Sequence, residues 1–174
     1  SHYFDEGTTG ERLMIAYLSD AFAMEAQGLT QKTEQKNSLW YAAGILNDDL
    51  SNDVLCYGIH AKTRSGACHQ GIEGFLTQQE PVRLTLYTLG NLQEVRPKTD
   101  GGKVYVMENP SVFSEIVRRH PKTAAICTDG QPRLAVFVLM DLLKAHTVFY
   151  YMGDFDPEGL LIAQRLKERY DNRL

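Results

Sequence analysis

The chain has 174 residues, 43% of them hydrophobic, and a formal net charge of −4, values that allow one globular domain or one domain with a helical extension. No apolar run is long enough to cross a membrane and no secretion leader opens the chain, so we expect a cytoplasmic protein with no membrane partner. Three cysteines without a Cys-x-x-Cys spacing also indicate a reducing compartment. The acidic balance disfavours a protein that binds DNA on its own, but it is compatible with an acidic metal site inside a larger assembly.

The first part of the chain has mainly helical periodicity. Apolar residues at helical spacing predict amphipathic helices over residues 11–27 and about 32–47. Residues 54–57 fit either a strand or a helical turn, and the glycine-rich stretch 58–74 predicts a loop or linker. We therefore expect a mainly helical N-terminal region over residues 1–78.

The second part of the chain alternates between strand and helix patterns. Residues 81–89 favour a strand and leave a short helix open. After them, strands are expected at 104–107, 123–127 and 147–152, and helices at 111–120, 133–145 and 160–170. Such alternation over short connections predicts an α/β fold, with a parallel sheet covered by helices on both faces. We place this α/β domain at residues 79–174 and leave open whether the fold is truncated at its C-terminus.

Each regular strand of this domain ends in an acidic or polar turn. The turns contain Glu108, Asp129, and the pair Asp154 and Asp156. Parallel strands end at the same edge of a sheet, so these carboxylates should gather in one crevice, where they repel one another unless a cation or protons compensate. A set of oxygen ligands without histidine or cysteine favours Mg²⁺ or Mn²⁺ over zinc.

Simpler roles exist for some of these carboxylates. Asp156 precedes a proline and is well placed to cap a helix, and Glu158 would then favour the helix dipole. Asp129 and the glycine after it fit an ordinary turn. Glu108 and Asp154 have no such role, and the conjunction of both with Asp156 is what indicates a metal site.

These residues carry a resemblance to a known family. A strand ending in Glu108, followed by a strand ending in Asp154-x-Asp156, resembles the Toprim domain. That domain is shared by type IA and type II topoisomerases, bacterial primases and overcoming-lysogenization-type nucleases. The string Gly-Asp-Phe-Asp-Pro-Glu-Gly-Leu at 153–160 is most similar to the branch of the topoisomerase VI A subunit and the meiotic double-strand-break protein.

Two further stretches, 106–110 and 127–132, resemble a bacterial relative of that branch. Its members include the nuclease subunit of Wadjet-type plasmid-defence systems. The resemblance covers roughly residues 81–170, and it implies a Rossmann-like, three-layer α/β fold.

The resemblance also implies roles for single residues. Asp154 and Asp156 would be ligands of Mg²⁺ or Mn²⁺, and Glu108 a ligand or the general acid/base. Beyond the resemblance, Arg133 lies next to the Asp129 turn and is the candidate for a phosphate contact. Asp129 and Glu158 are candidate accessory residues.

The function that the resemblance implies is a metal-dependent DNA endonuclease domain in a multi-subunit anti-plasmid defence or DNA-processing complex. The expected partners are DNA, an SMC-like or other complex subunit, N-terminal DNA-binding domains outside this chain, and a second copy in a homodimer. Topoisomerases of this branch cleave DNA with a tyrosine on a winged-helix domain. No tyrosine of this chain has such a context, so hydrolysis is expected rather than transesterification.

Three alternatives remain open at this stage. One is a non-catalytic Toprim-like module that binds DNA or a partner, the second is a topoisomerase-like cleavage subunit, and the third is a small-molecule phosphohydrolase. A shared metal site requires a particular strand order, because the strands that end at Glu108 and Asp154 must be neighbours in the sheet. We therefore predict that the first strand of the regular region lies between the second and the third.

Overall fold

The computed structural model describes residues 7–22, 32–45, 49–99 and 101–174. The chain divides into two compact units, Ser1–Asp48 and Asp49–Leu174, which are described separately. Among the described residues, no helix is both long enough and apolar enough to cross a membrane.

The first unit contains two helices, α1 (Thr9–Ala21) and α2 (Lys32–Ala42). Thr8 begins α1 as its N-cap, because its hydroxyl accepts a hydrogen bond from a backbone N–H of the first turn. Leu18 of α1 and two residues of α2, Leu39 and Trp40, form a small buried cluster. Both predicted helices are present, but α2 ends at Ala42 and residues 43–45, which the prediction included, are not helical. The predicted residues 23–27 and 46–47 lie outside the described ones.

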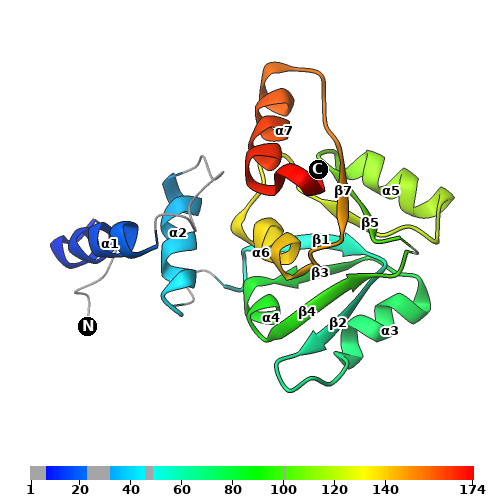
Figure 1. Cartoon of the computed structure of the whole chain (residues 1–174), viewed down its shortest axis with the longest axis horizontal. Coiled ribbons are helices and arrows are strands. Elements are labelled where there is room, and N and C mark those ends of the chain that lie inside the picture. The colour runs from blue at the N-terminus through cyan, green and yellow to red at the C-terminus, as the bar shows by residue number, and fades with distance from the viewer. Residues whose placement is uncertain (1–6, 23–31, 46–48, 100) are drawn as a thin grey trace. The chain divides into compact units, whose positions relative to one another are not determined.

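The second unit is built on a five-stranded sheet (Figure 1). Its strands, in spatial order, are β3 (Val82–Thr85), β1 (Asp53–Tyr57), β6 (Ala125–Cys127), β5 (Lys103–Met107) and β7 (Val148–Met152). Strands β6, β5 and β7 are parallel, whereas β1 is antiparallel to both of its neighbours. The α/β class is confirmed, and the sheet is mixed rather than wholly parallel.

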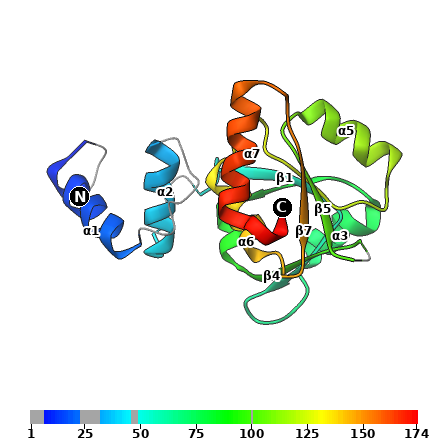
Figure 2. The ribbon, with the colours of Figure 1, turned by 45° about the horizontal axis from the view of Figure 1, so that its top comes forward.

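Helices cover both faces of this sheet (Figure 2). On one face, α5 (Pro110–Arg119) packs Phe113 into a buried cluster with residues of β1, β5 and β6. On the other face lie α6 (Leu134–Leu142) and α7 (Pro157–Tyr170), and the ring of Tyr170 packs edge-on against Phe149 of β7, with the centroids 5.2 Å apart. Helix α6 is almost wholly apolar and buried, and it therefore forms the centre of this layer. A 3₁₀ turn, Asp171–Arg173, follows α7.

The stretch 58–74 was expected to be a loop, and that prediction is wrong. It contains β2 (Ile59–Thr63) and the start of α3 (Gln70–Gln78), and β2 pairs with β4 (Leu92–Pro97) in a separate two-stranded sheet. Strand β2 alternates over only a few residues, and the buried residues of β4 are three positions apart, so the pairing depends on contacts distant in sequence. Residues 81–89 were compatible with a strand or a short helix, and the structure contains both. Strand β3 is followed directly by the short helix α4 (Leu86–Gly90).

Strand β1 lies before the boundary predicted at residue 78, as do β2 and α3. Residues 54–57, which fitted either a strand or a helical turn, form β1, and this strand pairs with β3 on one side and β6 on the other. The compact unit that contains the sheet accordingly begins at Asp49.

Candidate functional site

The carboxyl ends of β5 and β7 form the edge where the site is built. These two strands are paired in parallel, with Met107 of β5 opposite Met152 of β7. The ladder continues one step further, since the amide of Glu108 donates to the carbonyl of Met152 at 3.1 Å. The predicted order of the three regular strands is confirmed, because β5 lies between β6 and β7.

The half-buried carboxylate of Glu108 accepts two hydrogen bonds from the segment that follows β7. Its Oε2 atom accepts from the hydroxyl of Tyr151 at 3.0 Å and from the backbone amide of Asp154 at 3.3 Å. Burial raises the pKa of Tyr151 well above its ordinary value, and the negative charge of Glu108 raises it further. The phenol therefore keeps its proton at neutral pH and remains a donor to Glu108.

Two glycines allow this arrangement. A Cβ at Gly153 would lie 2.4 Å from the hydroxyl oxygen of Tyr151, so a side chain there would push the phenol away from Glu108. A Cβ at Gly159, in the first turn of α7, would lie 2.2 Å from the carbonyl oxygen of Asp154. The absence of a side chain at both positions thus lets the Asp154 turn fold closely over the start of α7.

Asp156 begins α7 as its N-cap. Its Oδ1 atom accepts from the amide of Gly159 at 2.7 Å, and Pro157 occupies the first helical position. The capping interpretation of Asp156 is confirmed, and Asp154 and Asp156 are both exposed on either side of Phe155, whose side chain is 99% exposed. Glu158, in the first turn, accepts from the side-chain amide of Gln131 at 3.0 Å.

The turn after β6 lies beside the Glu108 backbone. Asp129 and Gly130 both have positive φ angles, 56° and 84°, and the amide of Gly130 donates to the carbonyl of Glu108 at 3.2 Å. Arg83 of β3 lies near Asp129, with 3.7 Å between guanidinium and carboxylate, and pairs more closely with Asp53 at 2.8 Å. A guanidinium thus offsets part of the negative charge at this end of the site.

Arg133, the candidate for a phosphate contact, occupies the N-cap position of α6. Its side chain is exposed and makes no capping hydrogen bond. The structure places it one short turn after Asp129, at the same edge of the sheet.

The structure brings the Asp154 backbone directly to the carboxylate of Glu108. The described part of the chain contains no group of three histidine, cysteine, aspartate or glutamate side chains arranged to hold a metal ion. Mg²⁺ needs fewer protein ligands than that, because it usually takes one or two carboxylates and keeps several waters. The carboxylate oxygens of Glu108, Asp154 and Asp156 are the hard oxygen donors that Mg²⁺ prefers.

Two residues of this site were missed from the sequence. Tyr151 was assigned only to a buried strand, and the following Gly153, which leaves room for its hydroxyl, was the one available signal. Arg83 gave no signal at all, because it comes from β3, which is distant in sequence and reaches this edge only through the mixed sheet.

The fold and this edge define a class: an α/β protein with carboxylates in the turns that follow its parallel strands. Residues 82–174 match the family described as protein of unknown function C-terminus (DUF2399), and residues 1–61 match the one described as protein of unknown function N-terminus (DUF3323). Since the first match spans more than half of the chain, the chain belongs to the DUF2399 family. Comparisons with curated proteins and with solved structures gave no match.

Proposed function

We propose that this chain carries a Toprim-like, Mg²⁺-dependent DNA endonuclease site, working within a multi-subunit defence or DNA-processing complex in the cytoplasm. The observation that carries the proposal is the hydrogen bond from the Asp154 amide to the Glu108 carboxylate. It joins the ends of two adjacent parallel strands, which is where α/β proteins bind ligands.

Glu108, Asp154 and Asp156 would hold the divalent cation. When bound, such a cation supplies positive charge that stabilises the negative charge developing on a phosphate during hydrolysis. Among the described residues, both hydrogen bonds to the Glu108 carboxylate go to Oε2, which leaves Oε1 without a described donor. Glu108 would accept a proton from the attacking water through Oε1 while Tyr151 keeps the carboxylate oriented.

The reaction we propose is hydrolysis. The water oxygen attacks phosphorus, one P–O ester bond breaks, and the departing oxygen takes up a proton. The alternative nucleophile at this edge is Tyr151, but its raised pKa and its hydrogen bond to Glu108 make the phenolate scarce at neutral pH. Water is therefore favoured over a tyrosine nucleophile.

The second candidate is a non-catalytic module that binds DNA or a partner protein. The observation in its favour is the engagement of Asp156 with the first turn of α7, together with the lack of a three-residue metal group in the described residues. The two candidates differ in whether phosphodiester cleavage depends on these carboxylates.

The test is to incubate the full-length protein and its complex partners with circular plasmid and Mg²⁺ or Mn²⁺. We expect the parent protein to cleave the plasmid and EDTA to abolish that cleavage. Glu108→Ala and Asp154→Ala should each reduce the cleavage rate by about 100-fold or more. Glu80→Ala removes an exposed carboxylate from the segment between α3 and β3 and serves as the charge-matched control. Plasmid left intact, or cleaved equally by all three variants, would rule out the nuclease.

A further inference from the structure

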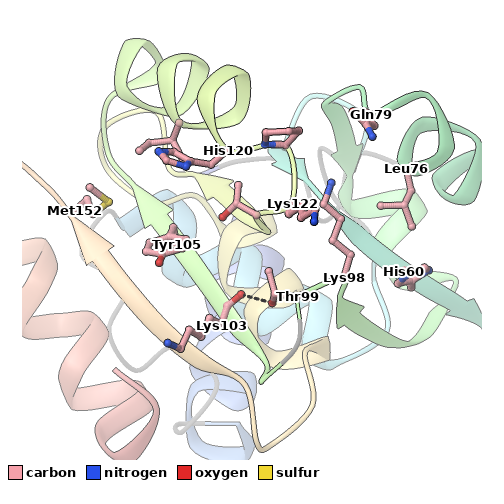
Figure 3. Close-up of a pocket in the computed structure, with 13 residues that line it drawn as sticks. His60, Leu76, Gln79, Lys98, Thr99, Lys103, Tyr105, His120, Lys122 and Met152 are labelled. Carbon is pink, nitrogen blue, oxygen red and sulfur yellow. Dashed lines mark hydrogen bonds between the residues drawn. The ribbon is translucent and has the colours of Figure 1, made fainter.

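A cavity of about 790 Å³ lies on the α5 face of the sheet, and Figure 3 shows residues that line it. Its walls come from β5, from the segment after α5, from the segment after β4 and from α3. This volume falls within the range of small-molecule and cofactor sites. The carboxylates of the proposed metal site do not line this cavity, so a ligand bound in the cavity would contact other residues.

The polar lining of this cavity is basic. Three lysines and two histidines contribute to it, and among the described residues no aspartate or glutamate does: the five are His60, Lys98, Lys103, His120 and Lys122. This composition is unusual in a chain with a net charge of −4. His60 does pair with Glu73, which lies outside the lining, at 3.0 Å. The cavity thus gathers positive charge in an acidic protein.

The lysines of the lining have no acidic partner among the described residues. In the part of the chain that the structure describes, no ion pair involves Lys98, Lys103 or Lys122, whereas Lys36 and Lys144 elsewhere each pair with a glutamate. Lys98 lies over an aromatic ring instead, 4.1 Å from the centroid of Tyr57. In Figure 3 the side chains of Lys98 and Lys122 extend into the same space. Cations that converge without counter-charges repel one another, and an anionic ligand would relieve that repulsion.

The rest of the wall is apolar and partly aromatic. Tyr105, Ile116 and Met152 contribute to it, and the ring of Tyr150 lies 5.5 Å from that of Tyr105. Tyr150 is 42% exposed, although it belongs to a strand. Tyr105 itself is half-buried and Tyr150 lies outside the lining. Aromatic rings beside lysines are the combination on which unpaired bases stack while their phosphates are neutralised.

We propose that this cavity binds an unpaired nucleotide, with its phosphate at Lys98 and Lys122 and its base against the Tyr105 wall. A base in a duplex is already stacked and cannot enter a concave site, so the ligand is either a free nucleotide or a single strand. The proposal does not depend on the nuclease, because binding needs neither metal nor cleavage.

The experiment measures binding by fluorescence anisotropy in EDTA, with the full-length protein at low salt. Two probes separate the sources: mant-labelled ATP for a free nucleotide, and fluorescein-labelled octathymidylate for a single strand. Lys122→Glu and Lys98→Glu are the test variants, since these two lysines are assigned to the phosphate. Lys122 is exposed and Lys98 is half-buried. Lys167→Glu, on the exposed surface of α7, changes the net charge equally and is the matched control.

We expect at least one probe to bind, with about tenfold weaker binding for both test variants and unchanged binding for the control. The probe that binds more tightly identifies the source of the nucleotide. Binding of neither probe overturns the proposal, as does equal weakening by Lys167→Glu, which would indicate attraction by net charge alone. Cleavage of plasmid by a protein that fails this test would leave the nuclease proposal intact.

Discussion

The Glu108 carboxylate receives its donors from residues that lie more than 40 positions further along the chain. Its own strand delivers it to the sheet edge, but Tyr151 and the Asp154 amide orient it. A hydrogen bond to a charged group contributes about 1.5–3 kcal/mol, enough to fix one rotamer. The orientation of Glu108 is therefore a property of the β5–β7 pair and not of either strand alone.

The raised pKa of Tyr151 leads to a prediction about alkaline stability. The folded state binds the phenolic proton more tightly than the unfolded state does, whose pKa is about 10. The resulting stabilisation is fully present below about pH 10 and is lost as the pH rises above that value. Between about pH 9 and pH 11, the unfolding free energy of the Tyr151→Phe variant should fall by less than that of the parent protein.

Urea unfolding at several pH values provides the measurement. Tyr87→Phe, which alters an exposed tyrosine, should follow the parent across this range. Identical pH dependence for Tyr151→Phe and the parent would show that Tyr151 is not linked to folding in this way.

Asp156 has two assigned roles, helix cap and metal ligand, and two substitutions separate them. Asparagine caps a helix about as well as aspartate does, so Asp156→Asn should keep the stability of the parent while weakening metal-dependent cleavage. Asp156→Ala removes both roles and should cost about 1 kcal/mol of unfolding free energy as well. Chemical denaturation and the plasmid assay measure the two effects. Full cleavage by Asp156→Asn would leave Asp156 as a cap only.

At the scale of elements, the first turn of α7 is held close to the Asp154 turn by the absence of a side chain at Gly159. A Cβ there would meet backbone, which cannot move aside as a flexible side chain does. We expect Gly159→Ala to destabilise the protein by about 1–3 kcal/mol, although alanine is the better helix former. Urea unfolding measures this change.

Gly74 supplies the control for that prediction. It also lies within a helix, α3, but a Cβ at this position would meet nothing within 4 Å. Gly74→Ala should therefore stabilise the protein by about 0.5–1 kcal/mol. Equal effects of the two substitutions would contradict the close approach at Gly159.

The elements that were predicted correctly share strong local patterns. Strands β5, β6 and β7 are short apolar runs, and each is followed by a helix with its own periodicity. The strands β2 and β4 contain charged residues, among them Lys62, Glu94 and Arg96. The hydrophobic pattern that would predict these strands from the sequence is therefore weak. These strands form because they pair with each other, and a pairing across about 30 residues leaves little trace in a local window.

At the scale of the whole molecule, the two compact units have separate cores. The cluster of Leu18, Leu39 and Trp40 belongs to the first unit, and the sheet with its helices belongs to the second. Two short helices with so small a core are only marginally stable. We expect the first unit to unfold at a lower urea concentration than the second.

Trp40 makes this expectation measurable, because it is the single tryptophan of the chain. Its fluorescence reports on the first unit, while far-UV circular dichroism is dominated by the second, which holds most of the helices and all of the described strands. The fluorescence transition should precede the dichroism transition. Coincident transitions would mean that the two units unfold as one.

The sequence alone determined the α/β class, the three parallel strands with their helices, and the carboxylates at the ends of those strands. These follow from local periodicity and from the rule that parallel strands end at one edge. Only the tertiary structure decided that β1 joins the sheet in antiparallel orientation, that Tyr151 and the Asp154 amide orient Glu108, and that five basic residues line one cavity. Each of these depends on contacts between residues far apart in the chain, whose partners are set by the packing of the whole sheet.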